Sequence, residues 1–410
     1  MSPTEDAAAP LTVPEAVGPP LPLAQAAAAM SMGIFALLMA GVLPVLLGGL
    51  VDIHRLSAAE LGRAATLEGL AMGLSTGAAG ALLKPVGLRP VGAAMGLALA
   101  GLDLATAWAS GTDVVLLRAA AGIPEGILLW ITIGMVARHA TPERLAGILV
   151  AAMTLAQFFL ALLLTIYVLP DFGSKGGLIA LAIATVPAAI LCWFGPKDYA
   201  PLVKPVGETS APPLRGWAAL VATVVFTAAF PAVAVYLQPL AHQAGLDANV
   251  ARIALTLGLL AQVIGGAAAA GIAGRVHYMP VFAVGAIGFL ICWTFTGMTV
   301  PAWVFIAVTA LAGLIYLFTT PFLVPMTIEA DPSRRAAVMS GGAQVLGGAL
   351  GPLAASFIVS DANVHGALYL GGAFLIGGLV MMAGMHIVAL RDRAHRQIAV
   401  SGPAIAGEET

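Results

Sequence analysis

The sequence predicts an all-α membrane protein with twelve transmembrane helices, arranged as two six-helix bundles that are related by a parallel repeat. Three observations support this fold class. Of the 410 residues, 60% are hydrophobic and only 9% are charged, which is too little polar surface to cover a soluble protein of that size. Twelve apolar runs are each long enough to cross a bilayer as a helix. Loop motifs of the first half recur in the second half at one fixed offset.

The apolar runs form two groups of six. Each run holds about 20 residues or more, the length that a helix needs to cross the hydrocarbon core. None shows the strict alternation of polar and apolar residues that is typical of barrel strands, so helices are predicted throughout. The runs cover residues 24–50, 58–83, 90–110, 112–137, 144–169 and 176–195, and then residues 215–240, 249–274, 279–298, 301–327, 334–359 and 365–390.

Polar segments before, between and after these groups divide the chain into five parts. The first segment is rich in Pro and Ala and has no Lys or Arg, so it lacks the basic start of a signal peptide. We predict a disordered cytoplasmic N-terminal tail (1–22), a first bundle (23–196), a central cytoplasmic loop (197–214), a second bundle (215–391) and a cytoplasmic C-terminal tail (392–410).

The distribution of Lys and Arg predicts the orientation. With the N-terminus in the cytoplasm, thirteen of these residues fall in inner loops and the tail, and four fall in outer loops. This positive-inside pattern places both termini on the cytoplasmic side of the cytoplasmic (inner) membrane. The net charge is −2 and the basic residues are scattered, which argues against nucleic-acid binding. Cys192 and Cys292 lie in apolar runs, where packing is the expected role of both.

Two loops carry the internal repeat. The motif "PVG" at Pro90 is matched by "PVF" at Pro280, and "TPERLAG" from Thr141 is matched by "DPSRRAA" from Asp331. Both matches have the same separation along the chain, called the repeat offset below, and each follows the same number of helices. A parallel repeat of two six-helix units is therefore predicted, as in transporters whose halves rock about a central site.

Three local motifs resemble those of the major facilitator superfamily. The segment "GALLKPVGLRP", from Gly80 to Pro90, is similar to the family motif G-x-L-x-D-R-x-G-R-R through Gly80, Leu82, Gly87 and Arg89. It has Lys84 where the family has Asp.

The second motif lies in the loop "AGIAGRVHYMP", which keeps Arg275 but has Gly274 at the Asp position. The third is R-x-x-x-G-x-x-x-G at Arg118, Gly122 and Gly126, which resembles the family motif of the fourth helix. The fifth predicted helix lacks the Gly-Pro antiporter motif, and the first lacks the acidic pair of aromatic-acid symporters. The sequence therefore does not identify the substrate.

Four charged side chains fall inside predicted helices, where each costs at least about 2.5–3.5 kcal/mol by insertion scales. They are the candidates for proton coupling and charge recognition: Glu68, Asp103, Arg118 and Glu125. At the repeat offset, the residues of the second half that correspond to Arg118 and Glu125 are Val308 and Ile315. Any ion coupling is therefore expected in the first half.

Helix geometry relates two of these charges. Arg118 and Glu125 are seven residues apart, which is close to two turns, so both project from one face. Pro124 lies between them and has no backbone N–H to donate, so it is expected to kink the helix there. In one interpretation, Glu125 exchanges protons while Arg118 tunes it or holds an anionic substrate.

In the other interpretation, Arg118 pairs permanently with Asp103, which lies at a similar depth, and Glu125 is only solvated by the cavity. Glu68 is interpreted as a structural or gating residue, and Asp103 as a partner. Uncharged cavity candidates come from the predicted helices that line the centre of the family fold, although such residues often only pack or anchor. They are Phe35, Met39, Trp130, Gln157, Tyr236, Tyr316 and Gln344.

The family resemblance also implies a cytoplasmic gate between the loop after helix 2 and the start of helix 11. Lys84 would meet the positive end of that helix unfavourably unless Glu329 or Asp331 pairs with it. The alternative is that Lys84 serves only as a topology signal. The gate candidates are Lys84, Gly87, Arg89, Arg144, Arg275, Glu329, Asp331 and Arg334.

The predicted function is secondary active transport of a small, amphipathic or aromatic organic molecule, coupled to protons and directed outward. The alternatives are uptake of an organic acid bound by Arg118, or uncoupled facilitation. A membrane-embedded enzyme is less consistent, because the seven histidines show no H-E-x-x-H or paired spacing. A permease-like sensor is less consistent, because such a protein usually carries an added soluble domain. No enzyme activity, cofactor or metal is predicted. The expected partners are the substrate, H⁺ and the lipid bilayer, and the expected state is a monomer.

Overall fold

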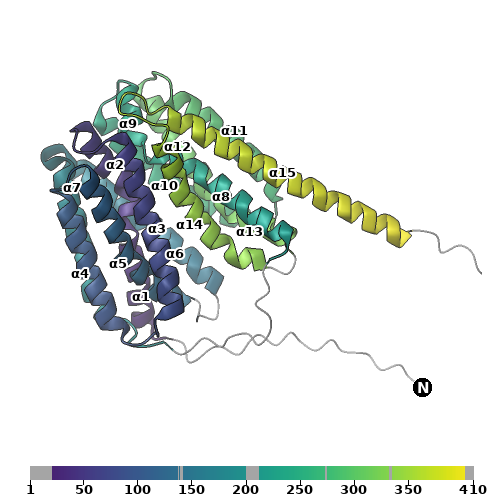
Figure 1. The fold of residues 1–410 in the computed structure, drawn as a ribbon, viewed down its shortest axis with the longest axis horizontal. Helices are drawn as coiled ribbons and strands as arrows, with labels where there is room; N and C mark the ends of the chain where they lie inside the picture. The colour runs from purple at the N-terminus through teal and green to yellow at the C-terminus, as the bar shows by residue number, and fades with distance from the viewer. Residues whose placement is uncertain are drawn as a thin grey trace, which may run out of the picture.

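The computed structural model describes residues 21–136, 138, 142–199, 212–272, 275–331 and 335–401, and these are almost entirely helical (Figure 1). The only bridge of β type within this part of the chain is an isolated pair between Ser360 and Asn363. Most of the N-terminal tail and of the central loop predicted from the sequence lies outside the described residues.

The described part of the first half contains seven α-helices. The first span is divided at Leu37, and the last two are joined without an intervening loop. Gly173 turns the chain within this joined stretch, because its φ of 58° is one that glycine adopts without steric cost. The elements are α1 (Leu23–Ala36), α2 (Leu38–Asp52), α3 (Ala58–Leu82), α4 (Leu88–Thr106), α5 (Thr112–Val136), α6 (Pro142–Leu163), the π-helix η1 (Leu164–Val168), α7 (Leu169–Leu191) and the 3₁₀ turn η2 (Cys192–Phe194).

The second half follows the same order. Its elements are α8 (Leu214–Ala234), α9 (Leu237–Gln243), α10 (Ala248–Ile272), α11 (Tyr278–Thr296), α12 (Ala302–Thr319), the 3₁₀ turn η3 (Thr320–Phe322), α13 (Leu323–Ala330), α14 (Arg335–Ser356) and α15 (Gly366–Ser401). Helix α15 projects beyond the other helices (Figure 1) and continues into the segment expected to be a tail.

Helix bounds repeat between the halves at the repeat offset that the sequence shows. The bounds of α3 and α4 match those of α10 and α11 at both ends, and the first residue of α5 matches the first residue of α12. The packing repeats as well, since α3 packs on α5 as α10 packs on α12, and α4 contacts α5 as α11 contacts α12. The same local architecture is therefore built twice.

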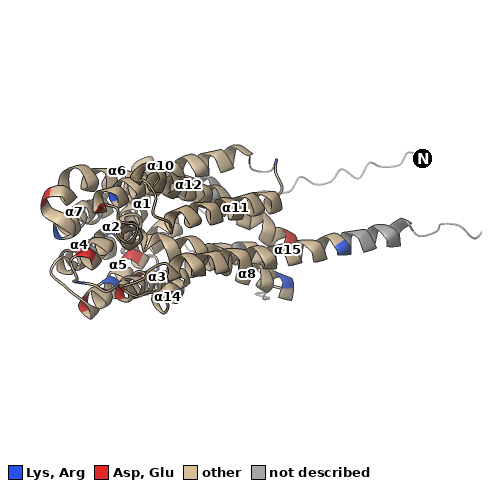
Figure 2. Cartoon of the chain, turned by 90° about the horizontal axis from the view of Figure 1, so that it is seen from above, with Lys and Arg blue, Asp and Glu red and all other residues tan. Residues whose placement is uncertain are grey.

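Nine helical stretches of the described residues are long and apolar enough to cross a membrane. One of them, Leu145–Phe194, includes both α6 and α7. Helices α3 and α14 are not among the nine, although α3 has 25 residues and α14 has 22. Helix α3 carries three charged residues and α14 carries five glycines, so both are less apolar than their neighbours. Figure 2 shows few charged residues between the helix ends.

The two halves meet along α3 and α14 and along α6 and α10. Helices α3 and α14 are close at one end, where a methyl group on Gly62 would lie 2.8 Å from the carbonyl oxygen of Pro352. They separate towards the other end. A methyl group on Gly73 would lie 3.7 Å from Val345, and one on Gly77 would meet nothing within 4 Å.

The region around Asp52 and Ala58, where α3 begins, is called the closed end below. Two hydrogen bonds join the halves there. The side-chain amide of Gln238 donates to Asp52 Oδ2 at 2.7 Å, and the backbone N–H of Ala58 donates to Asp361 Oδ1 at 2.6 Å. The opposite region, where α3 ends at Leu82 and α14 begins, is called the open end.

Candidate functional site

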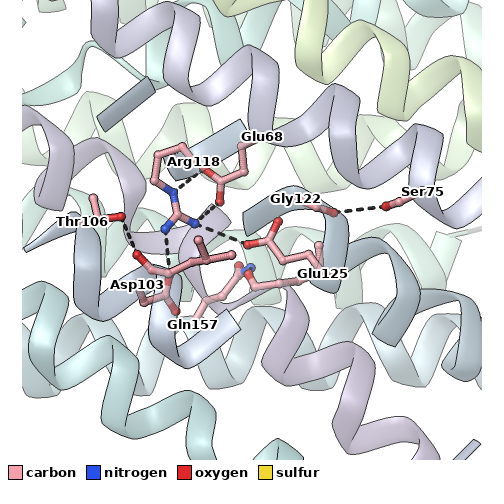
Figure 3. Close-up of polar contacts among 10 residues, drawn as sticks. Glu68, Ser75, Asp103, Thr106, Arg118, Gly122, Glu125 and Gln157 are labelled. Atoms are coloured by element: carbon pink, nitrogen blue, oxygen red, sulfur yellow. Dashed lines mark hydrogen bonds and ion pairs between the residues drawn. The ribbon is translucent and has the colours of Figure 1, made fainter. Parts of the chain in front are cut away.

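Four charged side chains gather between three helices of the first half (Figure 3). Glu68 comes from α3, Asp103 from α4, and Arg118 and Glu125 from α5. They are the four intramembrane charges that the sequence singles out, and the fold brings all four together. Their exposed fractions are 6% for Glu68, 3% for Glu125 and 0% for Asp103 and Arg118, so the cluster is removed from solvent.

Arg118 lies at the centre of the cluster. Its Nε and Nη2 atoms donate to the two oxygens of Glu68, at 3.0 and 2.5 Å, in the forked geometry that suits a guanidinium and a carboxylate. Its Nη1 atom donates to Asp103 Oδ1 at 2.7 Å. The contact between Nη2 and Glu125 Oε1 is longer, at 3.5 Å. Glu125 is therefore the acid that Arg118 holds most loosely.

Glycines on α5 allow α3 to approach closely enough for these contacts. A methyl group on Gly122 or Gly126 would overlap backbone oxygens of α3. The hydroxyls of Ser75 and Thr76 on α3 donate to the carbonyls of Gly122 and Gly126, at 3.2 and 2.9 Å. The small residues of α5 thus permit the close helix contact that brings Glu68 within reach of Arg118.

The formal charges of the cluster do not balance. Three carboxylates surround a single guanidinium, and like charges buried together cannot all be ionised without a large electrostatic cost. One oxygen of Asp103, Oδ2, has no hydrogen-bond partner among the described residues. An additional proton or cation would relieve the excess of negative charge.

The cluster contains the contacts of Arg118 on which the two interpretations from the sequence depend. The ion pair with Asp103 is present, and Glu125 lies on the same face as expected from its spacing along the helix. The fork with Glu68 was not expected from spacing. It depends on how α3 packs against α5, and the R-x-x-x-G-x-x-x-G pattern was the available signal, since it marks a face that a neighbouring helix can approach.

The cavity candidates are dispersed. Gln157 is drawn with the charge cluster in Figure 3, and its amide donates to the carbonyl of Leu37 at 2.6 Å, where the first span is divided. Tyr316 stacks on Phe230, with ring centroids 4.3 Å apart. Tyr236 is fully buried at the closed end, against Gly62. Met39 is buried, and three candidates are half-buried: Phe35, Trp130 and Gln344.

The gate candidates that the structure describes lie near the open end. Gly87 precedes α4 with a φ of 66°, and its N–H donates to Asp198 Oδ1 at 2.7 Å. Arg89 Nε donates to the carbonyl of Gly195 at 2.9 Å. These two residues therefore attach the loop after α3 to the end of the first half. Lys84 is exposed.

On the side of the second half, Asp331 accepts a hydrogen bond from the N–H of Ala336 in the first turn of α14, at 2.9 Å. Arg275 is exposed and donates to the carbonyl of Gly271. Arg334 and the side chain of Arg144 lie outside the described residues. The pairing of Lys84 with an acid of the second half stays a prediction.

One cluster was missed by the sequence analysis. His277, Glu329 and His386 come together beside the open end, although they lie in widely separated parts of the sequence. Such wide separations match no short metal-ligand or catalytic motif, so only the fold could bring these side chains together.

Comparison with solved structures shows the fold. The chain is similar to the nucleoside transporter NupG, at 12% identity and a TM-score of 0.65, over 88% of this chain and 98% of that one. The chain is also similar to a mutant of NupG, at 11% identity and a TM-score of 0.69, over 89% of this chain and 100% of that one. A third similar structure is a bacterial homolog of the human lysosomal transporter Spinster in an inward-facing and occupied conformation. It has 14% identity and a TM-score of 0.64, over 89% of this chain and 96% of that one.

A search of curated proteins found no match. The family model of the Major Facilitator Superfamily matches residues 23–344, which is well over half of the chain. The protein therefore belongs to the Major Facilitator Superfamily, and it is an integral membrane transporter of small molecules rather than an enzyme.

Proposed function

We propose that this transporter couples substrate movement to protons through Glu125. The cargo is a small amphipathic or aromatic organic molecule, and the direction is export. Transport proceeds by alternating access between two six-helix bundles of a twelve-helix fold.

The excess of acids in the buried cluster is the observation that carries this proposal. Glu68 and Asp103 are held by Arg118 at 2.5 and 2.7 Å, whereas Glu125 is 3.5 Å away. A proton on Glu125 removes one negative charge and breaks only the weakest of the three ion pairs. Glu125 is accordingly the acid whose proton exchanges at the smallest electrostatic cost.

The partners of Arg118 favour this function over uptake of an organic acid. Nε, Nη1 and Nη2 of the guanidinium already contact carboxylates, and the side chain has no exposed surface. An anionic substrate would have to displace Glu68 or Asp103 and join a site that already holds excess negative charge. A proton or a cationic group suits the cluster better.

The asymmetry between the closed and open ends supports alternating access. The positive-inside pattern assigns the open end to the cytoplasm, together with both termini, in the cytoplasmic membrane. The bonds from Gln238 to Asp52 and from Ala58 to Asp361 then act as an outer gate that must break before the site opens outward. Since both bundles lie in one chain, a monomer suffices for this cycle.

Export agrees with the mainly apolar and aromatic cavity candidates, one of which, Tyr316, stacks on Phe230 in the second half. Such surfaces bind hydrophobic and aromatic cargo by contact area, with few polar groups that fix its orientation. At the position of the second half that corresponds to Arg118 stands Val308, which cannot bind a hydrophilic anion by charge.

Proton movement in proteoliposomes tests the proposal. Wild type, Glu125→Gln and Asp113→Asn are reconstituted with an internal pH dye, and lipophilic amines and aromatic acids are supplied as candidate substrates. Asp113 is a matched control, because it is an exposed acid on the same helix. We expect substrate-driven proton movement in wild type and the control, and substrate exchange without protons in Glu125→Gln.

Two results would contradict this expectation. Proton coupling that persists in Glu125→Gln would exclude Glu125 as the exchanging group. Carriage of a compound by all three proteins without proton movement would indicate an uncoupled facilitator.

A further inference from the structure

Two histidines surround one glutamate beside the open end of the second half. His277 Nε2 lies 3.6 Å from Glu329 Oε2, and His386 Nδ1 lies 3.5 Å from Glu329 Oε1. One ligand atom from each residue can be chosen so that all three lie within 4.8 Å of one another. The centroids of the two imidazole rings are 4.7 Å apart, so both rings lie against the same small volume.

Three separate elements supply these side chains. His277 is the residue before α11, Glu329 lies in the last turn of α13, and His386 lies in the middle of α15. The Glu329 side chain is 10% exposed, His386 20% and His277 45%, so the cluster is anchored in the protein but reachable from water. The hydroxyl of Tyr278 also lies 3.3 Å from His386 Nδ1.

We propose that His277, Glu329 and His386 form a binding site for a divalent transition-metal ion such as Zn²⁺. Two imidazoles and one carboxylate are the ligand set of open, three-ligand zinc sites. With metal–ligand bonds of about 2.0–2.1 Å, tetrahedral coordination separates neighbouring ligand atoms by about 3.3–3.4 Å. The two contacts of 3.5 and 3.6 Å are close to that separation but reach different oxygens of Glu329. The three ligand atoms lie within 4.8 Å of one another, so side-chain rotations must bring them closer together on binding.

The hydrogen bond of His277 defines the rearrangement on binding. Its Nδ1 accepts from the N–H of Met279 at 3.2 Å, so in the metal-free protein the proton of the neutral ring is on Nε2. Coordination through Nε2 requires the proton on Nδ1, and the ring then gives up the bond from Met279. That bond is at the long end of the hydrogen-bond range, so little is lost.

A bound ion would join the start of α11, the end of α13 and α15 at the open end. It would also occupy Glu329, one of the two acids proposed to pair with Lys84 when the open end closes. Metal binding should therefore inhibit transport by holding the open end open. This second consequence rests on the proposed transport cycle, whereas binding itself does not.

Binding of Zn²⁺ to purified, untagged protein in detergent is measured first, by calorimetry. The variants are His277→Ala, His386→Ala and Glu329→Gln, and His242→Ala is the matched control because it removes an exposed histidine elsewhere. We expect one Zn²⁺ per chain, at least about tenfold weaker binding in each site variant, and unchanged binding in the control. Thermal unfolding without metal checks that each variant is folded.

Equal Zn²⁺ affinity in wild type and in folded His277→Ala and His386→Ala would overturn the site. Transport is then assayed in proteoliposomes with Zn²⁺ on the side of the open end. Inhibition in wild type and in His242→Ala, but not in His386→Ala, is the expected result. Binding without inhibition would retain the metal site and remove its link to the gate, so failure of the site and failure of the transport proposal are distinguishable.

Discussion

The two halves of this transporter share a scaffold but differ in the chemistry at its centre. At the repeat offset, the residues that correspond to Glu68, Asp103, Arg118 and Glu125 are Gly258, Trp293, Val308 and Ile315. Where the first half buries a charge cluster, the second half has a small apolar pocket of about 50 Å³, whose lining includes Gly258 and Trp293. Helix bounds nevertheless coincide, so the charges are not needed to build the helices.

Close helix packing, by contrast, is common to both halves. Gly122 lets α5 approach the backbone of α3, and Gly313 lets α12 approach the backbone of α10. The contact glycines occupy different positions, since Gly122 corresponds to Ala312. The comparison indicates that tight pairing belongs to the scaffold, while the cluster around Arg118 belongs to the first half and has apolar residues at the corresponding positions of the second half.

Removal of the central cation should have the largest effect. Arg118→Gln leaves three buried carboxylates without a counter-charge, so we expect the free energy of unfolding to fall by about 3–5 kcal/mol. Val308→Met at the corresponding position only enlarges a half-buried apolar side chain, so it should cost no more than about 1–3 kcal/mol. Thermal unfolding in detergent measures both. Similar losses of Tm would refute the asymmetry.

Added methyl groups at the paired glycines should have an intermediate effect. Gly122→Ala would overlap the carbonyl oxygen of Glu68, and Gly313→Ala would lie 2.6 Å from the carbonyl oxygen of Gly258. Both changes should destabilise the protein by about 1–3 kcal/mol through overpacking. Only Gly122→Ala should also alter proton coupling, because it moves Glu68 away from Arg118. Thermal unfolding measures the loss of stability in both variants, and a proton-flux assay measures the coupling. Equal changes in coupling would contradict the proposal that only the first half carries the proton site.

The smallest effect on stability is expected at the open end. Lys84 is exposed, so Lys84→Asp should leave Tm nearly unchanged while transport slows, because the partner acid of the second half is then repelled on closing. Asp331→Lys added to Lys84→Asp should restore part of the rate. Its Tm must be read alongside, since Asp331 also accepts the N–H of Ala336. No recovery in a folded double variant would exclude that pair.

Apolar length was sufficient to predict an all-helical membrane protein, because a bilayer imposes about 20 apolar residues on each crossing helix. It could not predict the division at Leu37 or the π-helical segment Leu164–Val168. The amide of Gln157, far along the chain, supports the carbonyl exposed at Leu37. Such irregularities depend on tertiary partners that hydropathy does not contain.

The candidate site was predictable to the extent that helix periodicity determines it. A spacing close to two turns placed Arg118 and Glu125 on one face, and similar depth related Asp103 to Arg118. Glu68 was not connected with them, because no rule of spacing relates residues on α3 to residues on α5. His277, Glu329 and His386 were missed for the same reason, as each comes from a different element.

The divergence of α3 from α14 makes the pair a lever with its fulcrum at one end. The stretch of helix from the contact at Gly62 to the open space at Gly77 is about 22 Å long. A rotation of only about 10° about that fulcrum displaces the far end by about 4 Å. Because the helix is long, a small change in packing at Gly62 and Pro352 produces a displacement at the far end that is large enough to admit or exclude a small molecule.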